Sequence, residues 1–386
     1  MQTLNNVSAQ PLEKSVYGNP TKRLFGNGSF EKLPFLLESF RVRNILLVLG
    51  EKSFRSSAYY SRLQEILAPY HVMSAEAVSP NPTAAFAQEG INRLKSLSFD
   101  LVLAVGGGSV LDMAKIFAAL PKQTDTNLEN YIERRTAIAA KPVPLIAIPT
   151  TSGTGSEVTP TASLETRDKK KISMDNPMFY PTIALIDPEL TYSMPAYVTA
   201  STGFDALSQA VESFWSVRAT PFSQTHSLRA LELIAGNFEK AYHFPDDPDS
   251  RSAMALASCE AGLAIAQTKT TAVHSVSYPI TAHFGVAHGH ACALTLAPFV
   301  RFNAPVMKES GRRMMKIFEA VDYEAMARWI EGLMQAMHLK NSLLNFGIDE
   351  KGREVIIRDG FRPDRMLNNP RQVSADDLRA ILNSVA

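Results

Sequence analysis

The sequence predicts an α/β half with a parallel sheet, followed by an all-α half. In the first half, short aliphatic runs without polar alternation are separated by helical patterns, which is typical of parallel strands covered by helices on both faces. After Asp187 and Pro188 such runs become scarce, and one helical pattern follows another. We therefore expect two domains, at residues 1–189 and 190–386.

The individual elements are expected from the same patterns. Strands are predicted at 44–49, 101–105, 145–148 and 183–186. Helices are predicted at about 57–68, 110–119, 204–214, 223–241, 252–266 and 323–337. The basic run 167–171 is predicted to be a solvated hairpin, in which Lys171 is the residue placed to point inward. No element is predicted for the polar stretch from Phe346 onward.

Composition and charge exclude several classes of protein. The chain has 386 residues, with 39 Lys and Arg against 38 Asp and Glu, so no charge excess points to nucleic acid or to an anionic membrane surface. No apolar run approaches the roughly 18 residues of a membrane-spanning helix, and the polar N-terminus is unlike a secretory signal. A cytoplasmic protein is expected, in which Cys259 and Cys292 are inert buried thiols.

A glycine-rich loop follows the second predicted strand. Gly106, Gly107, Gly108 and Ser109 lead directly into a helix, where backbone N–H groups can approach a phosphate at the positive end of the helix dipole. Asp112, one turn later, is placed to orient this loop. The alternative is a tight turn that needs glycine for its geometry alone. Three consecutive glycines after a strand favour the phosphate site.

A second loop of small and hydroxyl-bearing residues follows the third predicted strand. It spans 149–157 and includes Thr150, Thr151 and Thr154, whose hydroxyls could surround a ribose or pyrophosphate. A helix N-cap with a capping box would explain the same residues without a ligand. The glycine loop at a neighbouring strand end favours the ligand.

A metal site is predicted in the second half. Asp205 and Gln209 are four residues apart on one helix face. His274 and His288 belong to a run that holds four of the eight histidines within seventeen residues. One carboxylate and two imidazoles suit a divalent transition metal such as zinc or ferrous iron. A single histidine is usually a structural residue, but the clustering favours a metal.

Taken together, these motifs resemble the iron-containing (group III) alcohol dehydrogenase family. The resemblance runs from about Tyr17 to Asn303 and rests on GGGSVLDMAK, IPTTSGTGSEVT, ALIDPEL, FDALSQAVES and the histidine run ending in AHGH. It implies a dinucleotide-binding domain, a helical domain, and NAD(P)H and a divalent metal, Fe²⁺ or Zn²⁺, in the cleft between them. It also implies a small alcohol or aldehyde substrate and a possible homodimer.

The resemblance implies roles for individual residues. Gly106 to Ser109 and Asp112 would hold the pyrophosphate, Thr150, Thr151 and Thr154 the nicotinamide end, and Lys171 its ribose. Asp205, His274 and His288 fall on metal-ligand positions. Gly50 stands where a carboxylate would select NADH, so NADPH stays open, with Lys52 or Arg55 available for the extra phosphate.

Two positions depart from the family pattern. The family's second metal ligand is usually histidine, and here it is Gln209, whose amide oxygen is a weaker and harder donor. A second frequent histidine, near the nicotinamide, is replaced by Tyr278, which can donate a hydrogen bond but titrates far higher.

The departures resemble one subgroup, the phosphonoacetaldehyde reductases of phosphonate biosynthesis. The strings DALSQAVESFWS and HSVSYPITAHFGVAHGHACALTLAPF carry this resemblance. Binding a phosphonate requires cations or N–H donors, for which Lys269, Arg218, His283 and His290 are candidates. We take Tyr278, His288 and Lys269 as the catalytic group, with the alkoxide protonated through Tyr278, a histidine or water.

Three other functions are compatible with these residues. One is a general alcohol or diol dehydrogenase without phosphonate preference. Another is a lyase resembling dehydroquinate synthase, although IPTTSGTGSEVT and DALSQAVES argue against it. The third is a non-catalytic nucleotide-binding protein whose metal site has decayed at Gln209.

Overall fold

A six-stranded parallel sheet forms the first half of the chain. The computed structural model describes residues 18–307 and 311–386. Within them, the strand order of the sheet is β1-β8-β5-β4-β2-β3, and β6 and β7 form a separate antiparallel pair. The strands are β1 (Lys22–Phe25), β2 (Asn44–Leu49), β3 (His71–Ser74), β4 (Leu101–Gly106), β5 (Leu145–Pro149), β6 (Thr161–Glu165), β7 (Lys171–Asp175) and β8 (Ile183–Ile186).

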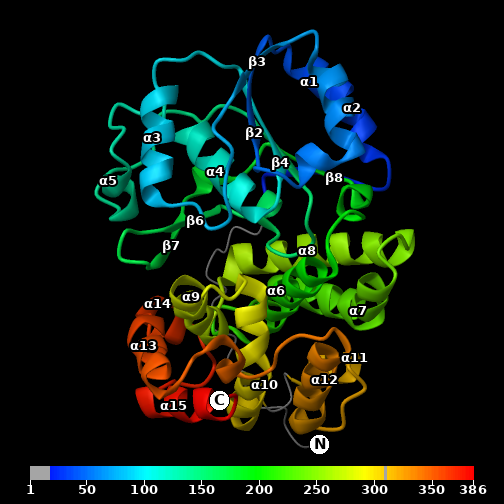
Figure 1. The fold of residues 1–386 in the computed structure, drawn as a ribbon, viewed down its shortest axis with the longest axis vertical. Helices are drawn as coiled ribbons and strands as arrows, with labels where there is room; N and C mark the ends of the chain where they lie inside the picture. Colours follow the sequence, from blue (N-terminus) through cyan, green and yellow to red (C-terminus); the bar gives the residue numbers. More distant parts are fainter. Residues whose placement is uncertain (1–17, 308–310) are drawn as a thin grey trace, which may run out of the picture.

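Helices cover both faces of this sheet (Figure 1). Because side chains alternate along a strand, Ile45 and Leu47 pack with α1 and α2, whereas Leu46 and Val48 pack with α3 and α4 on the other face. Both faces are buried, which explains why the predicted strands lack polar alternation. The helices of this half are α1 (Leu33–Phe40), α2 (Ala58–Leu67), α3 (Ala84–Leu94), α4 (Gly108–Ala119) and α5 (Leu128–Ile132).

The second half is helical and is built around α6. Nearly all residues of α6 from Thr199 onward are buried, because α7, α8 and α10 surround this helix. The helices are α6 (Ala196–Trp215), α7 (Pro221–His243), α8 (Pro248–Thr268), α9 (Ala272–Phe284), α10 (His288–Met307), α11 (Arg312–Ile317), α12 (Tyr323–Ala336), α13 (Glu350–Gly360), α14 (Pro363–Met366) and α15 (Ala375–Asn383). No helix in the described ranges combines the length and apolar character of a bilayer span.

The predicted strands and helices are confirmed, and so is the hairpin: residues 167–170 lie in the turn between β6 and β7, and Lys171 begins β7. The edge strands β1 and β3 were not predicted, and neither were α13, α14 and α15 in the stretch from Phe346 onward. These last helices matter for the site, because α13 and α14 pack against α9.

The sheet topology positions a binding site between the two halves. The chain adds β3 beyond β2, then returns to place β4, β5 and β8 on the other side of β2. In such sheets ligands bind at the carboxyl ends of the strands, where the winding direction reverses. The loops that follow β2, β4 and β5 lie at this edge, opposite α6 and α9 (Figure 1).

Candidate active site

A single cavity of about 620 Å³ lies between the sheet and the helical half. It brings together most of the residues singled out in the sequence. The predicted cofactor-binding residues that line it are Gly50, Gly107, Gly108, Ser109, Asp112, Thr150, Thr151, Thr154 and Lys171. The predicted metal-ligand and catalytic residues that line it are Asp205, Gln209, Lys269, His274, Tyr278 and His288. Gly106 is the exception, because it ends β4 and packs against Val110 beneath the loop.

The glycine loop presents the start of α4 to the cavity. Gly107 is the N-cap of this helix and Gly108 its first residue. A Cβ atom on Gly108 would lie 2.6 Å from the side chain of Thr154, so only glycine lets the two loops approach this closely. The first N–H groups of α4 and the hydroxyls of the second loop therefore face one space, as a pyrophosphate site requires.

Asp112 connects α4 to the neighbouring loop and hairpin. Its carboxylate accepts hydrogen bonds from Ser156 Oγ at 2.6 Å and from the Ser163 N–H at 2.9 Å. Lys115 was not predicted, although it is 1 % exposed and its Nζ donates to Ser156 Oγ at 2.6 Å. Burial lowers the pKa of Lys115. In the same region, burial raises the pKa of Glu157 to about 7.

The metal-ligand candidates converge from three helices. Asp205 and Gln209 lie on α6, His274 lies in the first turn of α9, and His288 is the first residue of α10. Ligand atoms of Asp205, His274, His288 and Cys292 all lie within 4.8 Å of one another. Cys292 was expected to be an inert thiol, but it is four residues after His288 and belongs to this cluster.

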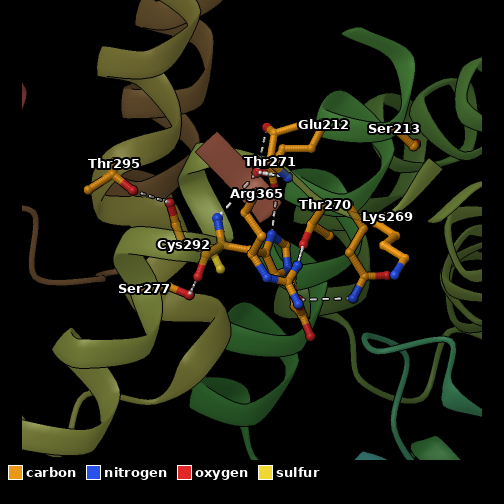
Figure 2. A network of polar contacts seen from close by, with 12 residues as sticks. Glu212, Ser213, Lys269, Thr270, Thr271, Ser277, Cys292, Thr295 and Arg365 are labelled. Carbon is orange, nitrogen blue, oxygen red and sulfur yellow. Dashed lines mark hydrogen bonds and ion pairs between the residues drawn. The ribbon is translucent and has the colours of Figure 1, made fainter. Parts of the chain in front are cut away.

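A buried carboxylate orients His274. Glu212 is fully buried and contacts His274 Nδ1. It also accepts from the Thr271 N–H at 2.9 Å and from the Thr271 hydroxyl at 2.8 Å (Figure 2). Because a carboxylate only accepts, a neutral His274 carries its proton on Nδ1. Nε2 then faces Asp205 Oδ1 at 3.2 Å with a free lone pair. Glu212 was not predicted, although its place seven residues after Asp205 on the same helix was the available signal.

The donor set fits a divalent transition metal. Burial raises the pKa of Asp205, but the contacts with His274 and His288 outweigh it and lower the pKa to about 2, so the carboxylate is ionised. Gln209 donates from Nε2 to Asp205 Oδ1 at 3.1 Å, and its buried Oε1 has no hydrogen-bond partner. An orphaned amide oxygen beside a carboxylate and two imidazoles matches the ligands of zinc or ferrous iron.

Tyr278 lies next to this cluster and is surrounded by cations. Its ring stacks on His288 with the centroids 5.6 Å apart. Lys171 Nζ lies 5.2 Å from the ring centroid, and the guanidinium carbons of Arg362 and Arg365 lie at 5.7 Å and 5.0 Å. Burial raises the pKa of Tyr278, but the charges of Arg365 and Lys171 outweigh it, so that the pKa is lower than usual.

The phosphonate candidates from the sequence are otherwise engaged or lie elsewhere. Lys269 lines the cavity but forms an ion pair with Asp175. Arg218 is exposed and outside the cavity lining. His283 pairs with Asp359 at 2.9 Å, and His290 contacts the Lys340 carbonyl at 2.7 Å. Sequence reasoning missed Arg362 and Arg365, because nothing in the polar C-terminal stretch signals that it returns to Tyr278.

The cavity starts at a glycine loop and ends at a carboxylate–imidazole cluster, an arrangement that fits a protein binding both a nucleotide and a divalent metal. Two family models agree with this reading. Residues 20–188 match the iron-containing alcohol dehydrogenase model, and residues 199–386 match the C-terminal model of the same family. The chain belongs to the iron-containing alcohol dehydrogenase family. It is an NAD(P)-dependent oxidoreductase that uses a divalent metal and acts on alcohols or aldehydes.

Individual relatives differ in their substrates. Long-chain-alcohol dehydrogenase 1 of Geobacillus thermodenitrificans is 35% identical over 81% of each chain. Phosphonoacetaldehyde reductase of Streptomyces viridochromogenes is 34% identical over 69% of this chain and 68% of its own. The crystal structure of sulfoacetaldehyde reductase from Bifidobacterium kashiwanohense in complex with NAD⁺ has a TM-score of 0.89 and 32% identity, covering 96% of this chain and 98% of that one.

Proposed function

We propose that the protein reduces phosphonoacetaldehyde to 2-hydroxyethylphosphonate, consuming one NAD(P)H and one proton. The observation that carries this proposal is the group of three cationic side chains around Tyr278, directly beside His288. These positive charges do not attract a neutral aldehyde, whereas they attract a substrate with an anionic group close to its carbonyl. The similarity to a phosphonoacetaldehyde reductase and to a sulfoacetaldehyde reductase supports the same substrate class.

Different residues of the chain bind the nucleotide and the metal. Gly107, Gly108 and the start of α4 bind the pyrophosphate, and Thr150 and Thr151 line the path toward the metal ligands. Asp205, Gln209, His274 and His288 are the residues that would hold the metal. When bound, the metal supplies Lewis-acid chemistry and the dihydronicotinamide supplies the hydride.

Tyr278 is the proposed proton donor to the carbonyl oxygen. Its hydroxyl lies 3.5 Å from Ser173 Oγ, in the cavity and beside the cluster. The nearby cations stabilise the phenolate that remains after proton transfer, which makes this tyrosine a better acid than an ordinary one. Glu212 acts through His274, by fixing its orientation.

A general alcohol dehydrogenase is the second candidate, because the long-chain-alcohol dehydrogenase is as similar as the phosphonoacetaldehyde reductase. The two functions are separated by steady-state kinetics with purified, metal-reconstituted protein. Loss of NADH or NADPH absorbance is followed with phosphonoacetaldehyde, acetaldehyde and propanal. We expect kcat/KM to be at least about tenfold higher for phosphonoacetaldehyde. Equal values for all three aldehydes would remove the phosphonate assignment and favour the general dehydrogenase.

A further inference from the structure

The C-terminal stretch supplies a buried arginine to the substrate end of the cavity. Arg365 lies on α14, lines the cavity and is 9 % exposed. Its Nη1 contacts the Thr270 hydroxyl, its Nη2 donates to Ser173 Oγ at 3.3 Å, and its buried Nε has no hydrogen-bond partner (Figure 2). Its side-chain hydrogen-bond partners are therefore neutral hydroxyls, and the Nε–H group has none.

No carboxylate neutralises this guanidinium. Among the ion pairs of the described residues, none involves Arg365 or Lys171. Burial raises the pKa of Asp175, whereas the hydrogen bond from Lys269 and, more weakly, the charge of Arg365 lower it. The Asp175 carboxylate is paired with Lys269. Asp364, at the same end of the cavity, lies 3.7 Å from Arg362. Of the three cations around Tyr278, Arg365 and Lys171 form no ion pair with a described carboxylate.

Burying an unpaired guanidinium is costly, because it loses its hydration without gaining a counter-charge. The close approach of Lys171 and Arg362 to the same ring adds like-charge repulsion. A ligand that carries negative charge would remove both penalties. The position indicates which part of a ligand this is, because Arg365 and the metal-ligand candidate His288 both contact the Tyr278 ring. A molecule that places its carbonyl oxygen at the cluster would place an anionic group a short distance away at Arg365.

We propose that Arg365 binds the tetrahedral oxyanion group of the substrate and makes the enzyme specific for short anionic aldehydes. This proposal rests on the proposed function and names the residue that carries its specificity. The planar fork of arginine offers two parallel N–H donors to one phosphonate or sulfonate group, which a lysine cannot match. Phosphonate and sulfonate can both accept these hydrogen bonds, and kcat/KM measured with an aldehyde of each kind distinguishes them.

The test compares Arg365→Gln with Arg218→Gln, which makes the same change on an exposed residue outside the cavity. For each protein, kcat/KM is measured with phosphonoacetaldehyde, sulfoacetaldehyde and propanal. In Arg365→Gln we expect the ratio of kcat/KM for phosphonoacetaldehyde to that for propanal to fall about 10- to 100-fold, and Arg218→Gln to keep the wild-type ratio. An unchanged ratio in Arg365→Gln would overturn the proposal. If kcat/KM falls equally for phosphonoacetaldehyde and propanal, the ratio is also unchanged and Arg365 has a structural role. A wild-type preference for sulfoacetaldehyde that depends on Arg365 would keep the subsite and change its natural ligand.

A binding measurement separates failure of the subsite from failure of the proposed function. Calorimetry with ethylphosphonate on the metal-loaded protein with bound nucleotide needs no turnover. Arg365-dependent binding without turnover of phosphonoacetaldehyde would keep the subsite and remove the proposed function. If the enzyme turns over phosphonoacetaldehyde but ethylphosphonate binds equally well to Arg365→Gln, the proposed function is kept and the Arg365 subsite is removed. If Arg365→Gln does not fold, Arg365→Lys serves instead, and it is expected to weaken ethylphosphonate binding while the melting temperature confirms folding.

Discussion

Glu212 and His274 form a buried carboxylate–imidazole pair behind the metal-ligand cluster. Both side chains are almost completely excluded from solvent. The pair fixes the ring of His274 before any metal binds, and it makes Nε2 more basic. Replacing Glu212 with Gln removes the charge and the strongest acceptor for Nδ1. We expect metal affinity to fall about 10- to 100-fold, measured by competition with a chromophoric chelator.

The matched control for this change is Glu239→Gln, on the exposed side of α7. It should bind metal like the wild type. Unchanged metal affinity in Glu212→Gln would show that Glu212 stabilises the fold without supporting the metal site.

The fourth metal ligand is expected to be Gln209. Its Oε1 is buried and unpartnered, and the residue lines the cavity, whereas Cys292 does not. The Co²⁺-substituted protein should therefore lack the intense near-ultraviolet band of a cobalt–thiolate bond. Gln209→His should bind metal more tightly, because imidazole is the better donor. A strong band that disappears in Cys292→Ser would instead identify Cys292 as the ligand.

Tyr278→Phe tests the proton donor. The change removes one hydroxyl and keeps the ring that stacks on His288. We expect kcat for phosphonoacetaldehyde to fall about 100-fold, with unchanged metal content. Tyr70→Phe, outside the cavity lining, is the control. If kcat of Tyr278→Phe stays at the wild-type value, water or a histidine delivers the proton.

Gly289 determines how closely α10 approaches α6. A Cβ atom there would collide with the backbone carbonyl of Ser201 and would lie 3.0 Å from Asp205 Cβ. Gly289→Ala should therefore lower the free energy of unfolding by about 1–3 kcal/mol and displace His288 from the cluster, which metal titration and denaturant unfolding measure. Gly236→Ala in α7, where a Cβ meets nothing within 4 Å, should be neutral or stabilising. Normal metal binding in Gly289→Ala would contradict this account of the contact.

Glu157 should make stability depend on pH. Its pKa is about 7 in the folded protein, against 4.5 for the unfolded chain, so the folded state binds the proton more tightly. Stability from this group is present below the unfolded pKa and is lost as pH rises toward the folded pKa, by up to about 3 kcal/mol. Glu157→Gln should flatten the profile between about pH 5 and about pH 8 in urea unfolding. A profile unchanged by Glu157→Gln would rule out this titration.

The parts of the fold that the sequence predicted are those with a local signal. The strands β2, β4, β5 and β8 are continuous apolar runs because helices cover them on both sides. The edge strands β1 and β3 have mostly exposed or half-buried residues, so their composition does not distinguish them from loops. The C-terminal helices α13 and α15 are amphipathic and short, and their polar faces dominate the composition.

The site divides in the same way. Asp205, His274 and His288 stand in short motifs whose residue types already indicate a metal. Arg365 has no such context, because its importance comes from packing against Tyr278 and Thr270, which lie far away in the chain. Charge pairing is likewise a property of the folded protein. Lys269 is a cation in the sequence, but Asp175 neutralises it only once β7 and α8 are in place.

The most direct test of the account is a crystal structure of the metal-loaded enzyme with NADP⁺ and 2-hydroxyethylphosphonate. We expect phosphonate oxygens to lie within hydrogen-bond distance of the Arg365 guanidinium. The hydroxyl of the same molecule should point toward Asp205, His274 and His288. A phosphonate group bound at Lys269, or a molecule whose hydroxyl points away from the cluster, would contradict it.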